Sequence, residues 1–279
     1  MVKAEEKVHE TTEKDGEFTI KMDNPRILKG IIETLSSIID EAMIKIDKSE
    51  FSIKAMDPSR ICLLQLSIKK VDFDEYKCSS KACQVGLNLD DLDKILRRSN
   101  ANDIIELSYK EVEQKIIIKM QREGNSRSRT FSLAILDIES EEVPMENLLK
   151  IDYSCKWKIE PEIVVEAIKD AEIYNEIFNF KASENGVNFS SRGQIGEMNY
   201  ELDVEDLVDH ECSEETTGAY SMVFLKSILK IASITDQLEI SLRTDHPLKM
   251  IFNLLEGGEL SYFLAPRVEE EGYDDEEEF

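Results

Sequence analysis

A hydrophobic pattern occurs twice in this chain, the second copy 133 residues after the first. Each copy has apolar residues at helical spacing and then at alternate positions, as in a helix that leads into a strand. The first match pairs Leu92, Ile95, Leu96, Ile105 and Leu107 with Leu225, Ile228, Leu229, Leu238 and Ile240. A second match, at an offset of 134 residues, pairs Ile44 and Ile46 with Phe178 and Phe180. Repetition of a helix–strand unit predicts two similar domains in tandem.

Helical and strand periodicities recur along both halves. One helix is predicted to begin at Pro25, because Asn24 can cap it and Pro suits the first helical position. Further helices are predicted at 90–99, from Pro161, and at 223–233. Strands are predicted at 18–22, 42–46, 51–55, 61–68, 85–89, 104–109, 115–120, 130–135, 153–159, 199–204, 238–243, 249–254 and 259–264. Their alternation predicts an α+β fold of two similar tandem domains, each with two helices packed on antiparallel sheets.

The predicted domains lie between charged ends. We expect a disordered extension at 1–16, a first domain at 17–136, an extended connector at 137–152, a second domain at 153–267 and a disordered acidic tail at 268–279. The connector is acidic and its apolar residues follow no clean period. A loop is predicted at 209–217.

The chain is strongly acidic, with 59 acidic residues against 34 lysines and arginines and a net charge of −25. The segment 268–279 alone holds eight acids and no base. A molecule of this charge repels nucleic acid in bulk. Any contact with DNA therefore needs a local patch of opposite sign.

The five cysteines and the hydropathy pattern indicate in which cellular environment the chain is expected. The cysteines are an odd number spread through apolar stretches, which suits buried thiols in a reducing environment. The chain holds no run of apolar residues long enough to span a membrane and no leader pattern at its start. We expect no membrane association.

No motif for catalysis or cofactor binding stands out. Nucleophile elbows, phosphate-binding glycine loops and paired-histidine metal motifs are missing from the sequence. Cys78 and Cys83 lack the spacing of a zinc site, so we expect no metal and no cofactor. Asp90, Asp91 and Asp93 suggest a carboxylate cluster, but acids in the first turn of a helix also favour its N-terminus.

Basic residues gather on the predicted helices. Lys94, Arg97 and Arg98 lie opposite the apolar face of the second helix, and Lys226 and Lys230 lie one turn apart on the fourth. Arg26 and Lys29 share a face of the first helix. Any surface helix carries lysines, so one such face means little. The 133-residue repeat places Arg97 on Lys230, so the same face is basic in both domains, which favours a surface that faces DNA.

Three runs of residues resemble the PCNA family of sliding clamps, and most closely its archaeal members. They are AMDPS at 55–59, FDEYKC at 73–78 and YFLAPR at 262–267, the last followed by acids. The likeness extends from Glu17 to about Val268. It implies a pseudo-sixfold ring of three two-domain subunits, with helices lining a central hole and sheets forming the outer wall.

The resemblance implies roles for particular residues. Residues facing DNA would be Arg26, Lys29, Lys94, Arg97, Arg98, Lys169, Lys226 and Lys230. Glu166 departs from the family, which commonly has a base at its position. A groove for short helical motifs of partner proteins would be formed by Met56, Arg60, Ile61, Leu63, Val143, Pro144, Pro247, Phe263, Ala265 and Pro266, although packing between the domains explains Leu63 equally well. Subunits would meet at Phe131 on one side and at Ala171, Tyr174, Ile195 and Tyr200 on the other.

The resemblance predicts a DNA sliding clamp without enzymatic activity. Its implied partners are double-stranded DNA, DNA polymerase, the clamp loader (replication factor C), flap endonuclease, DNA ligase and further copies of the chain. The expected location is the archaeal cytoplasm beside the nucleoid, or the nucleus in a eukaryotic host. Three alternatives remain: one subunit of a heterotrimeric or checkpoint-type clamp, a metal-dependent hydrolase using the aspartates above, and an acidic scaffold that does not bind DNA.

Overall fold

The computed structural model describes residues 16–79, 81–122, 124, 126–138 and 145–267. The predictions for the two ends of the chain therefore lie almost wholly outside the described residues. The α-helices are α1 Pro25–Ser36, α2 Leu89–Leu96, α3 Met145–Leu149, α4 Pro161–Ala171 and α5 Met222–Ile228. Short 3-10 helices are η1 Lys70–Asp72, η2 Glu111–Glu113, η3 Val204–Asp206 and η4 Leu229–Ile234.

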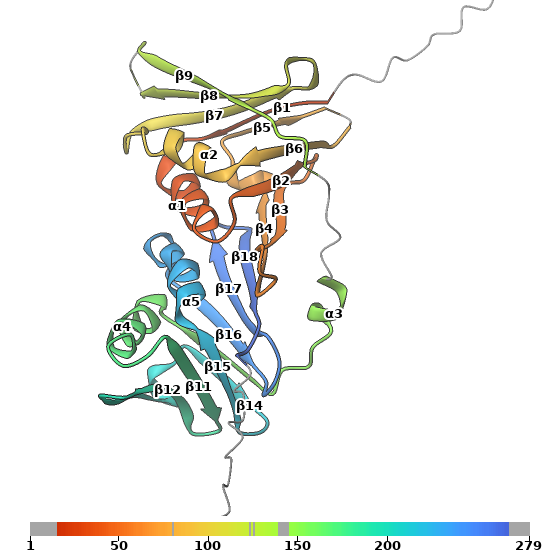
Figure 1. Cartoon of the computed structure of the whole chain (residues 1–279). Helices are drawn as coiled ribbons and strands as arrows, with labels where there is room; N and C mark the ends of the chain where they lie inside the picture. The colour runs from red at the N-terminus through yellow and green to blue at the C-terminus, as the bar shows by residue number, and fades with distance from the viewer. Residues whose placement is uncertain (1–15, 80, 123, 125, 139–144, 268–279) are drawn as a thin grey trace, which may run out of the picture.

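Strands make up most of the remaining fold (Figure 1). In the first half they are β1 Glu17–Met22, β2 Glu41–Ile46, β3 Glu50–Met56, β4 Cys62–Lys69, β5 Glu75–Cys78, β6 Cys83–Asn88, β7 Asp103–Lys110, β8 Lys115–Arg122 and β9 Ser128–Ala134. In the second half they are β10 Cys155–Ile159, β11 Ile177–Ser183, β12 Gly186–Gly193, β13 Gly196–Asp203, β14 Asp209–Cys212, β15 Thr216–Ser221, β16 Leu238–Leu242, β17 Leu248–Leu254 and β18 Gly258–Leu264.

The two halves share one continuous sheet. Nine strands run in the order β14-β10-β16-β17-β18-β4-β3-β2-β6, and the antiparallel pair β18–β4 joins the C-terminal half to the N-terminal half. A five-stranded sheet, β5-β1-β7-β8-β9, closes one end of the molecule and a four-stranded sheet, β13-β12-β11-β15, closes the other. Among the described residues all the strand pairs are antiparallel, as the alternation in the sequence predicted.

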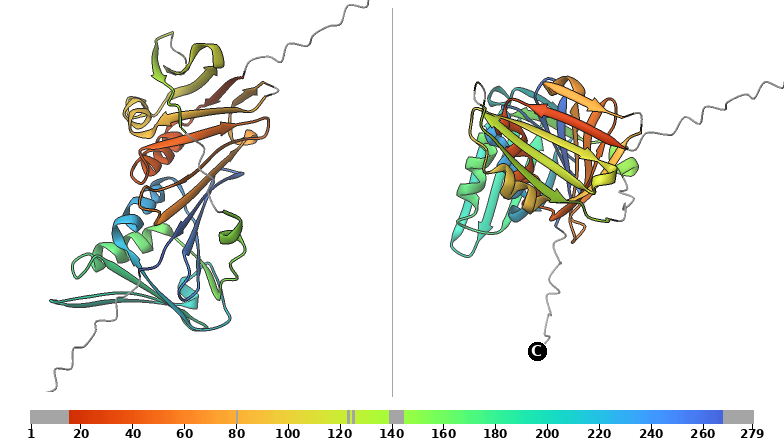
Figure 2. Two further views of the ribbon diagram at one scale, coloured as in Figure 1. Left: turned by 45° about the vertical axis from the view of Figure 1, so that its right-hand side comes forward. Right: turned by 90° about the horizontal axis from the view of Figure 1, so that it is seen from above.

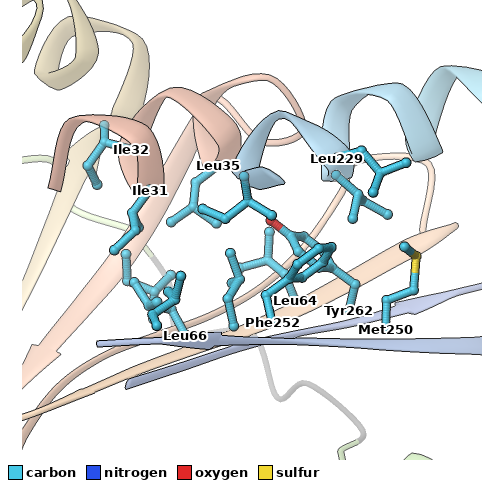
Figure 3. Packing of buried hydrophobic residues seen from close by; sticks show 14 of the residues in the cluster. Ile31, Ile32, Leu35, Leu64, Leu66, Leu229, Met250, Phe252 and Tyr262 are labelled. Carbon is cyan, nitrogen blue, oxygen red and sulfur yellow. The ribbon is translucent and has the colours of Figure 1, made fainter. Parts of the chain in front are cut away.

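The main helices lie together on one side of the nine-stranded sheet, in both views (Figures 1 and 2). Helix α1 contacts α2 on one side and η4 on the other, and η4 with α5 contacts α4. Their apolar faces point into the core, where each fully buried Leu or Ile contributes about 1.5–3 kcal/mol. Figure 3 shows Ile31, Ile32, Leu35 and Leu229 of the helices facing Leu64, Leu66, Met250, Phe252 and Tyr262 of the sheet.

Helix α1 begins and packs as its sequence indicates. The side chain of Asn24 accepts a hydrogen bond from the backbone N–H of Arg26 at 3.2 Å, and Pro25 occupies the first turn. Gly30 lies where α1 crosses η4, and a Cβ there would lie 3.0 Å from the side chain of Ile234. The lack of a side chain thus lets helices of the two halves approach closely.

Several predicted elements differ from the structure. Helix α2 ends at Leu96 rather than at 99, and the predicted helix 223–233 is α5 followed by the tighter η4. The predicted loop 209–217 holds β14 and the start of β15. The connector was predicted to be extended, but Met145–Leu149 form α3. The polar sequence of β14 and the single turn of α3 show little hydrophobic periodicity. Pairing with β10 stabilises β14, and packing on Leu63 and Phe263 stabilises α3, so neither needs a periodic sequence.

The expectation that all five cysteines are thiols is wrong for two of them. Cys155 and Cys212 are direct cross-strand neighbours on β10 and β14 and form a disulfide, with 4.1 Å between their Cα atoms. The flanking backbone bond from Ser213 N–H to the Ser154 carbonyl, at 2.9 Å, leaves the two cysteines at a non-hydrogen-bonded pair, where side chains lie closest. Cys62, Cys78 and Cys83 are free.

Candidate nucleic-acid interface and partner groove

The helices α1, α2, α4, α5 and η4 bring basic side chains from both halves of the chain to one layer of the molecule (Figure 1). Arg26, Lys94, Lys169, Lys226 and Lys230 are exposed there, and Lys29 is partly exposed. The amphipathic pattern explains the placement, because the buried face of each helix is apolar and its cations occupy the opposite face.

Three lysines surround a cleft between α4 and the α5–η4 segment. Lys169, Lys226 and Lys230 line it with Glu172, and its volume is about 290 Å³. The floor is apolar and consists of Val165, Ile168 and Leu229. Lys226 forms an ion pair with the carboxylate of Glu172 across the cleft. The cleft thus concentrates positive charge, part of which Glu172 neutralises.

The corresponding cations of the first half are also paired with acids. Lys94 Nζ lies 2.9 Å from Asp91, and this hydrogen bond raises the pKa of Lys94. Arg97 Nε lies 2.7 Å from Asp93, and its Nη2 lies 3.2 Å from Glu33 of α1. The Lys94–Asp91 pair is exposed and weak, so Lys94 can exchange its carboxylate for a phosphate at low cost, whereas the buried Asp93 holds Arg97 more firmly.

Two arginines sit at junctions of the helical layer. The Arg26 guanidinium on α1 donates a hydrogen bond to the Ser233 carbonyl on η4, and so bridges the two halves of the chain. Arg98 lies just after α2, where its carbonyl accepts a hydrogen bond from Arg129 on β9 at 2.7 Å. Arg98 itself is exposed.

Glu166 and its neighbour Tyr200 explain one departure from the expected pattern. Glu166 is exposed on α4, and Tyr200 lies on the neighbouring strand β13. Burial raises the pKa of Tyr200, and the negative charge of Glu166, to which it is hydrogen-bonded, raises it further. On this helix Lys169 is the cation that lines the cleft.

The three aspartates at the start of α2 are explained by the helix itself. Asn88 caps the helix by accepting from the Asp91 N–H at 2.9 Å, and Asp91 and Asp93 pair with Lys94 and Arg97. Among the described residues no group of three or more His, Cys, Asp or Glu side chains is arranged to hold a metal ion. These aspartates therefore give no support to the alternative of a metal-dependent hydrolase.

An apolar row crosses the other face of the nine-stranded sheet. Met56 on β3 is the cross-strand partner of Leu63 on β4, and Leu63 is the partner of Phe263 on β18. Next to Phe263 on β17 is Lys249, whose Nζ lies 5.9 Å from the centre of the Phe263 ring. Because side chains alternate along a strand, Leu64 and Tyr262 point to the helices instead, as Figure 3 shows.

A buried carboxylate fixes the loop beside this row. Asp57, only 4% exposed, accepts backbone hydrogen bonds from Ser59 at 2.9 Å, Ile61 at 2.7 Å and Cys62 at 2.5 Å. The turn gives the exposed Arg60 a left-handed backbone with φ of 60°. Sequence reasoning did not single out Asp57, although an Asp followed by Pro and Ser is typical of a turn of this kind.

The loop and the C-terminal segment meet at the same edge. The Ala265 N–H donates to the Ile61 carbonyl at 2.9 Å, and Pro266 follows directly. Pro247 lies in the loop between β16 and β17. Its carbonyl accepts a hydrogen bond from the Tyr153 hydroxyl at 3.0 Å. Val143 and Pro144, predicted to complete the groove, lie outside the described residues.

The residues predicted at subunit contacts lie at the two ends of the molecule. Phe131 is on β9, the edge strand of the five-stranded sheet, and Tyr200 is on β13, the edge strand of the four-stranded sheet. Ile195, 74% exposed, lies in the turn before β13. Tyr174 packs behind that turn, since a Cβ on Gly193 would lie 1.9 Å from its carbonyl oxygen.

Ala171 does not fit this prediction. Its side chain is fully buried in the core at the end of α4, so it has no surface to offer a second subunit. The prediction for Ala171 was wrong because Ala171 lies on the buried face of α4 with Ala167 and Ile168, whereas Lys169 and Asp170 of the same turn are exposed.

The described residues contain no helix with the length and hydropathy needed to cross a membrane.

Comparisons with known proteins agree along the whole described chain. The family models for the N-terminal and C-terminal domains of proliferating cell nuclear antigen match residues 17–143 and 147–267 of this chain, respectively. The chain is 33% identical to a DNA polymerase sliding clamp of Pyrococcus horikoshii, and 32% identical to one of Pyrococcus furiosus. Each alignment covers 91% of this chain and 99% of the relative. A crystal structure of PCNA from Thermococcus kodakaraensis has the same fold, with a TM-score of 0.83 and 24% identity over 90% of this chain and all of that one.

Proposed function

This chain belongs to the PCNA family of DNA polymerase sliding clamps, and we propose that three copies of it form a closed ring around duplex DNA. The observation that carries the proposal is the layer of basic side chains on α1, α2, α4, α5 and η4. In a molecule with a net charge of −25, such a layer is the surface that a polyanion can approach.

The proposed contact with DNA is loose and independent of sequence. Lysine and arginine side chains at helix surfaces reach phosphates, which carry no sequence information. We assign this role to Arg26, Lys29, Lys94, Arg97, Arg98, Lys169, Lys226 and Lys230. Flexible, exposed cations exchange phosphates easily, so the ring can slide while topology prevents its loss. The acidic outer wall repels DNA and keeps it in the hole.

Ring closure is proposed to occur between edge strands. The unpaired edges of β9 and β13 belong to the sheets at the two ends of the molecule, so a head-to-tail contact can add one to the other. The two edges carry charges of opposite sign: Arg127 precedes β9 and Arg129 lies on it, ion-paired with Asp103, whereas Glu197, Glu201 and Asp203 lie on β13. We expect Phe131, Tyr174, Ile195 and Tyr200 at this contact.

Partner proteins are proposed to dock on the outer face of the nine-stranded sheet. Met56, Leu63 and Phe263 supply the apolar floor, and Arg60, Ile61, Pro247, Ala265 and Pro266 its margin. A short helical motif of the partner would lay its apolar side chains on this surface. The proposed partners are DNA polymerase, the clamp loader, flap endonuclease and DNA ligase, at the chromosome, and the clamp itself catalyses no reaction.

Encirclement is tested by retention on DNA of different topology. The clamp is loaded by its loader onto nicked circular DNA and onto the same DNA after linearisation, and the retained protein is measured over time. We expect retention on circles and escape from linear ends. Equal loss from both would refute encirclement, since a surface-bound protein is indifferent to DNA ends.

The number and identity of subunits are tested by native mass. A homotrimer has about three times the chain mass of 32.0 kDa. A monomer that reaches the ring mass only with another clamp subunit would show instead that the chain serves in a heterotrimeric clamp.

A further inference from the structure

The apolar row on the outer face of the sheet is covered by the chain's own connector. Met145 of α3 is 6% exposed and is buried together with Leu63 and Phe263, while Met56 and Leu148 pack against them. These five residues form a small cluster that is separate from the main core. In both views α3 lies on the side of the sheet opposite α1 and α5 (Figures 1 and 2).

Helix α3 has the form of a bound ligand rather than of a structural helix. It is five residues long, and a helix that short does not hold itself together in water. Met145 and Leu148 are three residues apart and therefore share one face, which rests on the apolar row. Leu149, next to Leu148, is 61% exposed, so only one face of the turn is used.

Among the residues that the structure describes, the attachments of α3 to the rest of the chain lie on its C-terminal side. Arg243 donates to the Asp152 carbonyl at 2.8 Å, and the Tyr153 hydroxyl donates to the Pro247 carbonyl at 3.0 Å. Between α3 and these anchors, Lys150 and Ile151 make only long backbone bonds of 3.3 and 3.4 Å. The helix can thus leave the row while the connector stays anchored at 152–153.

We propose that α3 is an internal ligand of the partner groove, which partner motifs must displace before they bind. The inference rests on the proposed docking function of this surface and adds its regulation. The fitting partner is a helical turn with two apolar side chains three residues apart, because Met145 and Leu148 show what the row accepts. Competition within the chain lowers every partner's apparent affinity by the fraction of time that the row is open. This common factor leaves the ratio of two partners' affinities unchanged, but it means that a partner occupies the row only when its concentration exceeds the raised dissociation constant.

The test removes the ligand and leaves the row intact. The double variant Met145→Ala and Leu148→Ala is compared with the wild type and with Leu149→Ala, which changes an exposed leucine of the same helix. The probe is a fluorescent peptide of residues 144–151 of this chain, supplied in trans and followed by anisotropy. A matched peptide has serine in place of its methionine and its first leucine.

We expect the double variant to bind the peptide about tenfold more tightly than the wild type or Leu149→Ala do, and none of the three to bind the serine peptide. Equal binding by all three proteins would overturn the proposal. Loss of binding in the double variant, with unchanged native mass and melting temperature, would also overturn it, because Met145 and Leu148 would then be part of the floor.

The two single variants guard against a folding defect, since each should give an intermediate gain. The NMR signal of the Met145 methyl group adds an independent readout in the wild type. It should lie upfield beside the Phe263 ring and move to a solvent-like position when peptide is added in excess. A Met145 signal that is solvent-like from the start would contradict the covered row. Retention on circular DNA is measured on the same proteins, so a failure of encirclement in all of them is distinguished from a failure of the competition.

Discussion

At the residue scale, Asp57 has the clearest structural role. Its carboxylate is buried and satisfies three backbone N–H groups of the loop that presents Ile61. Asp57→Ala leaves these donors unpaired, and we expect a loss of about 3 kcal/mol in the free energy of unfolding. Asp57→Asn keeps one acceptor oxygen and should lose less. Urea unfolding of both variants measures the difference; equal stability of Asp57→Ala and wild type would show that the loop finds other acceptors.

Glu172 provides a second prediction at this scale. It pairs with Lys226 beside the cleft that Lys169 and Lys230 also line. Glu172→Gln removes the competing charge at nearly the same shape, so we expect DNA to bind a few-fold more tightly at low salt, roughly the worth of one exposed pair. Glu176→Gln, which removes an acid outside the cleft, is the control. An unchanged affinity in Glu172→Gln would place this cleft away from the DNA.

Asp103 predicts a dependence of stability on pH. Burial raises its pKa, but hydrogen bonds from Asn100 and the nearby Arg129 guanidinium outweigh this, so the pKa lies below the usual 3.8. A lowered carboxyl pKa contributes stability at neutral pH, and this contribution is lost as the pH falls below about 4. The wild type should therefore lose more stability than Asp103→Asn between about pH 5 and pH 3. Parallel curves for the two proteins would mean that Asp103 titrates normally.

At the element scale, segments with a clear local signal were predictable, and segments held by their tertiary partners were not. Helix α1 was placed by Asn24, Pro25 and an apolar face, all local signals. The η4 segment continues the apolar period of α5, so nothing in the sequence marks the change to a tighter helix. Helix α3 has one turn, which is stabilised by packing on the apolar row. A single turn is too short to show a hydrophobic period in the sequence.

The site shows the same division between local and tertiary information. The basic faces of α2 and α5 followed from spacing and the repeat, whereas their acid partners Glu33 and Glu172 lie on other helices and could not be foreseen. The groove floor of Leu63 and Phe263 followed from family resemblance. Its cover by α3 did not, because it depends on a contact between segments far apart in the chain.

The edge strands allow a prediction about assembly. If β9 and β13 meet, lysines in place of Glu197 and Glu201 would bring positive charge to the edge that carries Arg127 and Arg129 and weaken the contact. We expect the double variant Glu197→Lys and Glu201→Lys to shift from ring to monomer in sedimentation at low salt. The double variant Glu184→Lys and Glu205→Lys changes the net charge equally at exposed sites off the edge, and should stay assembled. An intact ring in both would move the interface elsewhere.

At the scale of the whole molecule, the two faces of the nine-stranded sheet carry the two proposed functions, DNA contact and partner docking. The helices and their cations cover one face, and the apolar row and α3 lie on the other (Figure 2). A change on one face should therefore leave the function of the other intact. The Cys155–Cys212 disulfide and the β18–β4 pair, which joins the two halves of the chain, both lie within this sheet.

Charge removal tests this division directly. Replacing Lys94, Arg97, Lys226 and Lys230 by Ala removes four cations from the helical layer, and replacing Lys45, Lys48, Lys54 and Lys156 removes the same charge from other exposed positions. Each lost phosphate contact lowers the slope of log affinity against log salt by about 0.9. We expect the first variant to load slowly onto DNA with a shallower salt slope, and the second to load at least as well as the wild type.

Both variants should remain folded. The second should unfold at the wild-type temperature, since exposed lysines contribute little to stability, whereas the first should unfold at a somewhat lower temperature because Arg97→Ala leaves the buried Asp93 carboxylate without its partner. Equal loading defects would mean that total charge alone governs the approach to DNA. A loading defect in the first variant alone would instead show that the position of the cations matters, because both variants lose the same charge from an anionic chain. A protein with its cations spread at random would respond to their number, whereas a ring lined by them responds to their place.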